Sequence, residues 1–311
     1  MSKDHWLPLL SGMVVSMVFG LSFMVTRGAL TILTPLQLIG YRFALAIFTL
    51  SVLRYSGVIQ VNFRNKSLCS LALLALFQPV LYFLFETTGI KLTSASETGM
   101  MMGLIPVTTL LLEIPFFKTF PSWKQSLSIL LSVSGIFFIF IMQGNVQFGG
   151  NILGTLYLIG AILAGGMFNI FSKKSSSSFT PVEITYFMMS VGAIVFNIMA
   201  LGQSIMNKNL ADYLTPLKQP DVLIAILYLG ILSSVIAFFL MNYMLSKTQP
   251  SQTATYVNLT TVIAILGGIL FRGEHFAWYQ AVGTFMIITG VWGAMWFGQQ
   301  TKKSTPKTFT A

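Results

Sequence analysis

Charged residues are scarce in this chain: 8% of its 311 residues are Asp, Glu, Lys or Arg, whereas 55% are hydrophobic. Soluble domains carry about 25% charged residues, which cover their surface. A chain with so few charges has too little polar surface to be a soluble globular protein, and its long apolar runs are typical of transmembrane helices. The sequence therefore predicts an all-α integral membrane protein.

Cysteine and histidine are nearly absent, since the chain has one cysteine, Cys69, and two histidines. A single cysteine cannot form an intrachain disulfide, and the two shortages together argue against a Cys/His metal site. We expect Cys69, which lies in an apolar run, to be a buried structural thiol. The motifs HExxH and GxSxG and a glycine-rich phosphate loop are also missing from the sequence. The prediction is no enzyme, no metal site and no cofactor.

Acidic residues are also few, with 8 Asp and Glu against 18 Lys and Arg, which gives a formal net charge of +10. In a soluble protein this excess would favour nucleic acid as a partner. In a membrane protein it is typical of cytoplasmic loops, which collect Lys and Arg. With both termini in the cytoplasm, most basic residues fall in the inner loops. We therefore expect a multi-pass protein of the plasma membrane, with the lipid bilayer and no nucleic acid as partner.

Ten apolar segments are each about long enough to cross a membrane, which takes about 20 helical residues. The even number agrees with two termini on the same side, and the short links make successive helices antiparallel neighbours. Residues 298–311 form a polar cytoplasmic tail. The predicted spans are 7–27, 35–53, 68–90, 94–117, 122–142, 151–171, 181–201, 221–243, 250–271 and 277–297.

The two halves of the sequence resemble each other. FFKTFPSWKQ matches FRGEHFAWYQ at a shift of 155 residues, which also pairs Gly135 with Gly290. Closer to the start of each half, a shift of 146 residues pairs Thr34 with Thr180, and each threonine precedes a proline. Self-similarity at fixed shifts indicates an internal repeat.

Each predicted repeat, 7–142 and 151–297, contains five spans. Because five is odd, the second repeat enters the membrane from the side opposite to the first. Inverted repeats of this kind are typical of secondary transporters, whose substrate site lies at the interface of the repeats near the middle of the bilayer. The sequence therefore predicts ten transmembrane helices built from two inverted five-helix repeats.

Three motifs carry a resemblance to a known family: TPLQLIGYR after the first span, the hairpin GIKLTSASETGMMMGLIPV, and LFRGEHFAWYQAVGTFMIITGVW near the end. In their order and spacing they resemble the EamA domain of the drug/metabolite transporter superfamily, over about 7–297 as two tandem units. The resemblance implies ten helices with both ends cytoplasmic, and a cavity lined by spans 1, 3, 4, 6, 8 and 9. It also implies transport of small metabolites such as amino acids, by export in many members and by uptake or exchange in others.

The chain departs from the pattern of this family in several positions. The acid usual before the last helix of each unit is present as Glu274 but is Thr119 in the first unit. The proline of the fourth helix is present as Pro106 but is Thr261 in the second unit. These departures leave the predicted fold intact and leave the substrate open.

Charged residues inside spans cost about 2.5–3.5 kcal/mol each on insertion scales, and they are functional candidates by default. Four of them fall in the outer half of the first repeat: Glu86, Glu97, Arg27 and Arg42. One hypothesis is that Glu86 or Glu97 binds a proton or cation, which predicts proton coupling, while an arginine binds a carboxylate of the substrate. The second repeat has no matching pair of acids.

Each of these residues also has a structural interpretation. Glu97 is placed to complete a capping box at the start of its helix. Glu86 is placed to pair with Arg27 or Lys91, and Arg42 with helix ends or an acid. Arg27 can also extend outward to the membrane surface.

Two further acids are expected to be structural. Glu113, near the inner end of its span, is predicted to pair with Lys118 or Lys124. Glu183 lies in the first turn of a helix that begins at Pro181, where a carboxylate meets the helix dipole favourably.

Uncharged polar residues inside spans are expected to line the cavity or to form interhelical hydrogen bonds, each worth under about 1 kcal/mol. The candidates for the cavity are Tyr82, Asn169, Asn242, Tyr256 and Asn258. The residues predicted to let helices bend are Pro79, Pro106, Gly165 and Gly267.

The combined prediction is a secondary active transporter, monomeric or homodimeric, whose partner is a small-molecule substrate. It moves small amphipathic metabolites such as amino acids by alternating access, with export as the expected direction. An uptake or exchange carrier and a passive channel are the alternatives.

Overall fold

The computed structural model describes residues 3–93, 98, 101–118, 120–142, 152–206, 213–263, 266 and 277–304. Within these residues the regular structure is helical and contains no strand. Glu97 and Gly267, two of the residues predicted to be functional, lie outside this part of the chain.

Eight helical stretches within the described residues are long and apolar enough to cross a membrane, and they match eight of the ten predicted spans. Five are single helices: α1 (Lys3–Ala29), α2 (Pro35–Tyr55), α7 (Trp123–Met142), α8 (Ile152–Ser175) and α9 (Pro181–Met206). A sixth, α14 (Trp278–Ser304), ends the described chain. The other two are composite: α3 (Cys69–Ala75), η1 (Leu76–Leu81) and α4 (Tyr82–Leu92), and α10 (Pro220–Leu227), η4 (Tyr228–Ala237) and α11 (Phe238–Lys247).

The other two predicted spans, 94–117 and 250–271, lie partly outside the described residues, and their described parts are interrupted. In the first, a turn at 103–104 precedes α6 (Ile105–Phe117). The ring of Pro106 clashes with the carbonyl four residues earlier, so a regular helix cannot pass through this point. In the second, α12 (Pro250–Tyr256) ends in a turn at 257–258, and helix resumes over 259–263. The described parts of both predicted spans are therefore interrupted, and the count of ten transmembrane helices stays a prediction.

The same capping arrangement begins α2 and α9. The N–H of Gln37 donates to the Thr34 hydroxyl, and the Gln37 side chain accepts from the Thr34 N–H. Thr180 and Glu183 exchange equivalent hydrogen bonds at the start of α9. These reciprocal bonds satisfy backbone donors that a helix start leaves open.

The composite helices each contain a π-helical segment, η1 in one and η4 in the other. In η1 the backbone of Gln78 is extended, with φ −147° and ψ 116°, and Pro79 follows through a cis peptide bond. Pro79 thus lies at a break in its helix. Pro106 lies in the first turn of α6, directly after the turn at 103–104, and Gly165 lies inside the uninterrupted helix α8. The role of these residues as bending points stays a prediction.

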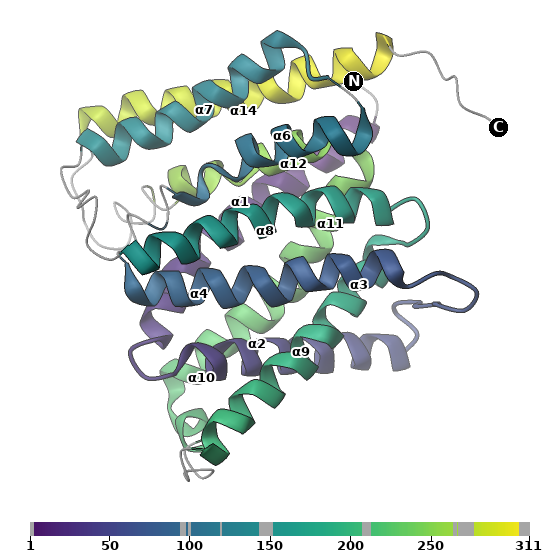
Figure 1. Cartoon of the computed structure of the whole chain (residues 1–311), viewed down its shortest axis with the longest axis vertical. Helices are drawn as coiled ribbons and strands as arrows, with labels where there is room; N and C mark the ends of the chain where they lie inside the picture. The colour runs from purple at the N-terminus through teal and green to yellow at the C-terminus, as the bar shows by residue number, and fades with distance from the viewer. Residues whose placement is uncertain are drawn as a thin grey trace.

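The helices form layers (Figure 1). One edge consists of α7 lying along α14, and the opposite edge contains α2 against α9. Between these edges lie α1, α6, α8, α12 and the two composite helices. α1 begins and α14 ends on the same side of the molecule (Figure 1).

Glycine lets α7 and α14 approach closely. A Cβ on Gly135 would meet the carbonyl oxygen of Gly283 at 2.7 Å, and a Cβ on Gly290 would meet that of Ser128 at 2.6 Å. Residue numbers rise along one helix as they fall along the other, so the pair is antiparallel. Small residues at such contacts are the usual basis of helix packing in membranes.

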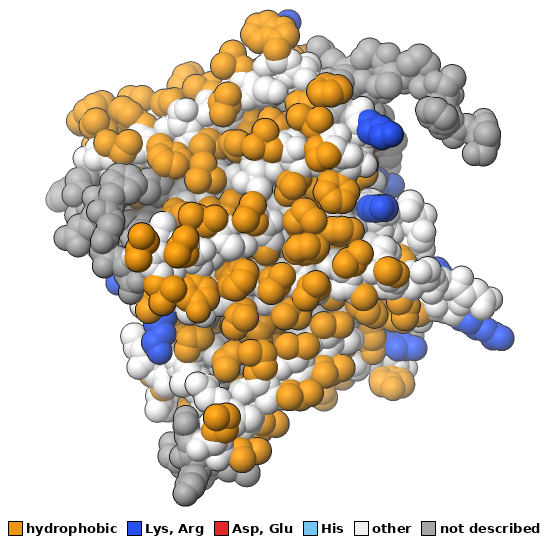
Figure 2. Space-filling view, in the orientation of Figure 1, with side chains coloured by type: hydrophobic (Ala, Val, Ile, Leu, Met, Phe, Trp, Pro, Cys, Tyr) orange, Lys and Arg blue, Asp and Glu red, His pale blue; other side chains and the backbone are white. Residues whose placement is uncertain are grey.

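The outer surface is apolar around the middle of the molecule. Figure 2 shows hydrophobic side chains spread over this face, with Lys and Arg near its edges. Large apolar side chains such as Phe48, Leu111 and Phe285 are more than half exposed, as expected for contact with lipid. Cys69 is exposed at the first residue of α3, so the prediction that it is buried is wrong.

The close contact at Gly290 predicts a stability effect. Gly290→Ala places a methyl group 2.5 Å from the Ser132 backbone nitrogen, and overpacking of this kind costs about 1–3 kcal/mol. We expect a lower unfolding temperature in detergent, measured by thermal denaturation. Gly202→Ala in α9 is the matched control, because a Cβ there meets nothing within 4 Å. Equal unfolding temperatures for the two variants would contradict the proposed role of the glycine contact.

Candidate functional site

A cavity of about 710 Å³ lies among the inner helices, within the range usual for small-molecule sites. Its walls come from α1, α2, η1, α4, α6, α7, α8, η4, α11 and α14, and from the interrupted segments around 103 and 258. At one end it is lined by the exposed residues Arg27, Gly28 and Thr31. We call this the Arg27 end, and the opposite end, where Glu113 lies, the Glu113 end.

Arg42 is the buried cation of the cavity. It lies on α2 and is 7% exposed. Its Nε donates to the hydroxyl of Ser234 at 2.7 Å, and its Nη2 donates to the hydroxyl of Ser233 at 2.8 Å. The guanidinium carbon lies 4.5 Å from the centre of the Phe83 ring, which is a favourable cation–π distance. Both serines belong to η4, so elements far apart in sequence hold this arginine in place.

Glu86 is the buried anion of the cavity. It lies on α4, is 8% exposed, and one of its oxygens accepts a hydrogen bond of 3.0 Å from the hydroxyl of Tyr82. The charge of Arg42 acts on Glu86 electrostatically. Among the described residues, however, neither of the two forms an ion pair. The predicted pairing of Glu86 with Arg27 or Lys91 is therefore absent, and Arg27 lies at the end of the cavity.

Two asparagines line the cavity in addition to Tyr82. Asn169 on α8 donates to the hydroxyl oxygen of Thr109 at 3.1 Å, and Asn258 donates to that of Ser132 at 3.0 Å. In each asparagine the amide oxygen is buried and has no hydrogen-bond partner in the described structure.

Two other predicted cavity residues, Asn242 and Tyr256, are not among the residues that line it. Asn242 accepts from Ser172 and donates to Thr185, so it joins α11 to α8 and α9. Tyr256 is 2% exposed, and its ring lies against Gly12 of α1. Both side chains point toward neighbouring helices and contact them, instead of lining the cavity.

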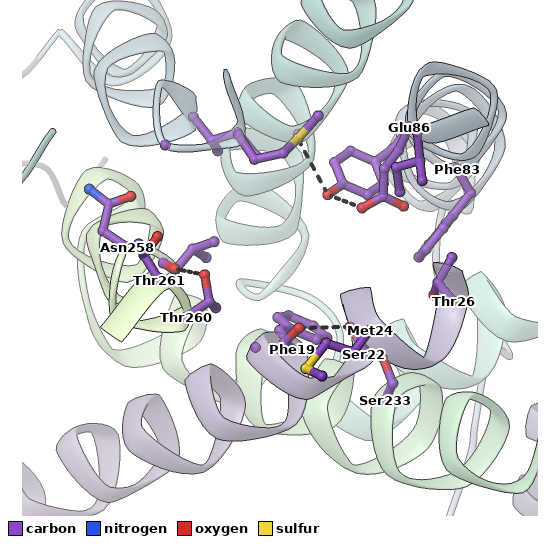
Figure 3. Close-up of a pocket in the computed structure, with 18 of the residues that line it drawn as sticks. Phe19, Ser22, Met24, Thr26, Phe83, Glu86, Ser233, Asn258, Thr260 and Thr261 are labelled. Carbon is purple, nitrogen blue, oxygen red and sulfur yellow. Dashed lines mark hydrogen bonds between the residues drawn. The ribbon is translucent and has the colours of Figure 1, made fainter. Parts of the chain in front are cut away.

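Figure 3 shows how the walls face one another: Asn258, Thr260 and Thr261 lie across the cavity from Glu86 and Phe83. Phe19 and Ser22 of α1 lie between these two walls (Figure 3). Sequence reasoning did not select Ser233 and Ser234. The signal available was two consecutive hydroxyls within the apolar run ILSSVIAFF.

At the Glu113 end, hydrogen bonds join elements that are distant in sequence. Glu113 on α6 is 5% exposed and accepts from the N–H of Ser251 in the first turn of α12 at 3.2 Å. The Gln125 amide on α7 donates to the side chains of Gln249 and Ser251. The prediction that Glu113 pairs with Lys118 or Lys124 is therefore wrong. Open amides at a helix start stabilise a carboxylate, and the start of α12 supplies such an amide to Glu113.

Glu183 has a structural role, as expected, but it makes direct contacts in addition to its interaction with the helix dipole. Its carboxylate forms an ion pair of 2.8 Å with Lys66 and accepts the backbone N–H groups of Asn62 and Thr180. It thereby ties the 56–68 connection to the start of α9.

Comparison with protein families decides the classification. Residues 6–141 and 152–296 each match the EamA-like transporter family. The chain belongs to this family. The resemblance seen in the sequence is thereby confirmed. Membership of this family, together with the apolar helices, indicates a multi-pass membrane protein. The family indicates a transporter rather than an enzyme.

Several relatives are similar to this EamA-family chain over most of its length. An uncharacterized transporter of Bacillus subtilis (strain 168), YcxC, is 31% identical over 92% of this chain and 91% of its own. An uncharacterized transporter of Archaeoglobus fulgidus is 22% identical over 88% and 93%. The WAT1-related protein At1g21890 of Arabidopsis thaliana is 22% identical over 85% and 76%. A crystal structure titled only as that of a protein shares the fold, with a TM-score of 0.74 at 14% identity over 94% and 98%.

The hydrogen bond of Glu113 predicts an effect on access to the cavity of this family member. Glu113→Ala removes a charge-assisted bond worth about 1.5–3 kcal/mol, so we expect the Glu113 end to open more often. In a Cys69→Ser background, a cysteine placed at Ile105 in the cavity wall reports access to an impermeant maleimide. Labelling from the Glu113 side should rise by about tenfold or more.

Glu183→Ala is the matched control for this experiment, since Glu183 is a buried acid whose partners Asn62, Thr180 and Lys66 lie on neither α6 nor α12. It should lower stability without changing the side from which the reporter is labelled. Unchanged labelling in Glu113→Ala would show that Glu113 contributes stability but does not hold this end closed.

Proposed function

We propose that this protein is a secondary active carrier that moves small amphipathic metabolites of the amino-acid type across the plasma membrane by alternating access. Its ten transmembrane helices form two inverted five-helix repeats, and both termini lie in the cytoplasm. Export is the expected direction. The cavity between Arg42, Glu86 and the two asparagines is the substrate site, and Glu86 is the residue through which protons couple to transport.

The observation that carries this proposal is the pair of buried opposite charges that do not bond to each other. Arg42 and Glu86 line one cavity, and neither forms an ion pair within the described residues. Burying a charge without an ionic partner is costly, and such residues inside membrane proteins mark transport pathways. A zwitterion supplies the missing partners, with its carboxylate at Arg42 and its ammonium at Glu86.

The contacts between the halves support the inverted repeat. The shift of 155 residues converts the contact of Gly135 with Gly283 into that of Gly290 with Ser128, and both are close. The hydroxyls of Thr93 and Thr98 are 3.1 Å apart, and the equivalent pair, Thr248 and Thr253, is 2.6 Å apart. When two halves contact each other in this reciprocal way, each half can adopt the conformation of the other.

The two ends of the cavity support alternating access. The Arg27 end is lined by exposed residues, whereas α6, α7 and α12 are joined by hydrogen bonds at the Glu113 end. A carrier requires such a difference between its ends, because a cavity open at both is a channel. With the termini in the cytoplasm, the Arg27 end faces outward.

Counterflow in proteoliposomes tests the proposed function. Purified protein is reconstituted in vesicles loaded with one unlabelled amino acid, and uptake of the labelled compound is followed for a panel of amino acids. A carrier gives saturable, transient accumulation driven by exchange. Flux that is linear in concentration, without exchange, would indicate a channel. Higher resistance to toxic amino-acid analogues, with lower internal solute, in cells that express the protein would support export.

Glu86→Gln should abolish proton-coupled transport while the protein is still expressed and folded. Glutamine keeps an oxygen that can accept the hydrogen bond from Tyr82, but it cannot bind or release a proton or attract an ammonium group. The measurement is counterflow and pH-driven uptake, alongside the unfolding temperature. Glu183→Gln, which changes a carboxylate outside the cavity, should keep exchange. Wild-type flux in Glu86→Gln would remove Glu86 from the mechanism.

A further inference from the structure

Each of the two asparagines of the cavity has a buried acceptor oxygen that lacks a partner in the described structure. Asn169 and Asn258 are both 1% exposed and line the cavity, and the amide oxygen of each is buried without a partner in the described structure. Leaving a buried acceptor unpaired is costly, so few such groups occur in native proteins. Their position beside a cavity indicates that a ligand supplies the missing donor.

The polarity of the Asn169 amide is fixed by its neighbour. The Thr109 hydroxyl donates its hydrogen to the carbonyl of Ile105 at 2.8 Å, so its oxygen can only accept from Asn169. The NH₂ group of Asn169 must therefore point at Thr109, and the carbonyl oxygen is the group left over. Since Asn169 lines the cavity, this oxygen is the acceptor that a donor group of a solute can pair with.

The two asparagines lie apart from Glu86. Pairs of contacts such as Gly160 with Phe85 and Gly165 with Tyr82 show that α4 and α8 run antiparallel. Asn169 is one turn beyond Gly165, about 6 Å further along α8 and away from Glu86. Asn258 lies across the cavity from Glu86 (Figure 3). A solute whose charged head lies at Arg42 and Glu86 would direct its other end toward these amides.

We propose that Asn169 and Asn258 form an acceptor subsite that selects solutes with a hydrogen-bond donor, such as a hydroxyl, at the end opposite the charged head. This inference rests on the proposed carrier function and narrows its substrate class. The apolar walls between, including Phe168 and Phe238, accept the carbon skeleton of the solute. An acceptor oxygen in a buried site rejects an isostere that lacks the donor, because the oxygen then stays unpaired.

The test compares solutes that match in shape but differ in a hydroxyl: threonine with valine, and tyrosine with phenylalanine. Each is used to inhibit counterflow of a labelled amino acid and to raise the unfolding temperature of the purified protein. In the wild type, the hydroxyl member of at least one pair should bind about tenfold more tightly, as expected for one hydrogen bond in a buried site. In Asn169→Leu, and separately in Asn258→Leu, this preference should fall toward equality while the apolar member still binds.

Thr260→Val is the matched control within the cavity, because the Thr260 hydroxyl already donates to the Val257 carbonyl and its loss should leave the preference unchanged. Asn169→Leu should also fold, since Thr109 keeps its bond to Ile105. Equal binding of the members of both pairs by the wild type, or an unaltered preference in both leucine variants, would overturn the subsite while leaving the carrier intact. If the wild type neither exchanges nor is stabilised by any amino acid of the full panel, the proposed function fails and the subsite with it.

Discussion

The hydrogen bonds from Arg42 to Ser233 and Ser234 are the interaction on which the inner structure depends. A guanidinium cannot lose its water in the middle of a membrane protein unless other groups take over its donors. Here two consecutive hydroxyls and the face of Phe83 do so. The π-helical turn of η4 contains both serines, and π-helical turns are frequent at functional sites. The arginine thus joins α2 to the composite helix that contains η4, and it forms no ion pair with an acid in the part of the chain that the structure describes.

The need to hide polar backbone explains where the helices are interrupted. Unpaired backbone groups are tolerated at membrane depth only where they are buried in protein or line a cavity. The turns at 103–104 and 257–258 and the break at Gln78 all adjoin the cavity, since Gly103, Asn258 and Gln78 line it. The uninterrupted helices α2, α7, α9 and α14 include the pairs at the two edges. Irregular backbone and ionisable side chains are therefore concentrated in the same place.

Patterns within short stretches of the sequence predicted most of the helices but few of the hydrogen-bond partners of the buried charged residues. Apolar length identified eight of the spans, and the Thr180–Glu183 capping contact is within one turn of helix. The partners of Arg42 and Glu113 lie 192 and 138 residues away, and only the packing of the halves brings them near. Because Ser251 is distant in sequence, the nearby residues Lys118 and Lys124 were the partners that the sequence predicted for Glu113. The cavity contains Arg42, Glu86, Tyr82, Asn169 and Asn258, but their part in transport stays a prediction.

The proposed repeat is also asymmetric at the Glu113 end, and this asymmetry affects the relative free energies of the two proposed states. The shift of 155 residues that relates the halves replaces Glu113 by Gly268 and Ser251 by Ser96. The second half therefore has no carboxylate to form the bond that Glu113 makes with the Ser251 amide. In the proposed alternating-access cycle, closure of the Glu113 end gains a charge-assisted hydrogen bond, about 1.5–3 kcal/mol, which the exchange of roles between the halves does not supply at the Arg27 end. Under this proposal a solute reverses the bias only through a difference in its affinity for the two states. Contacts that change between the two states, rather than tight binding alone, would then drive the cycle.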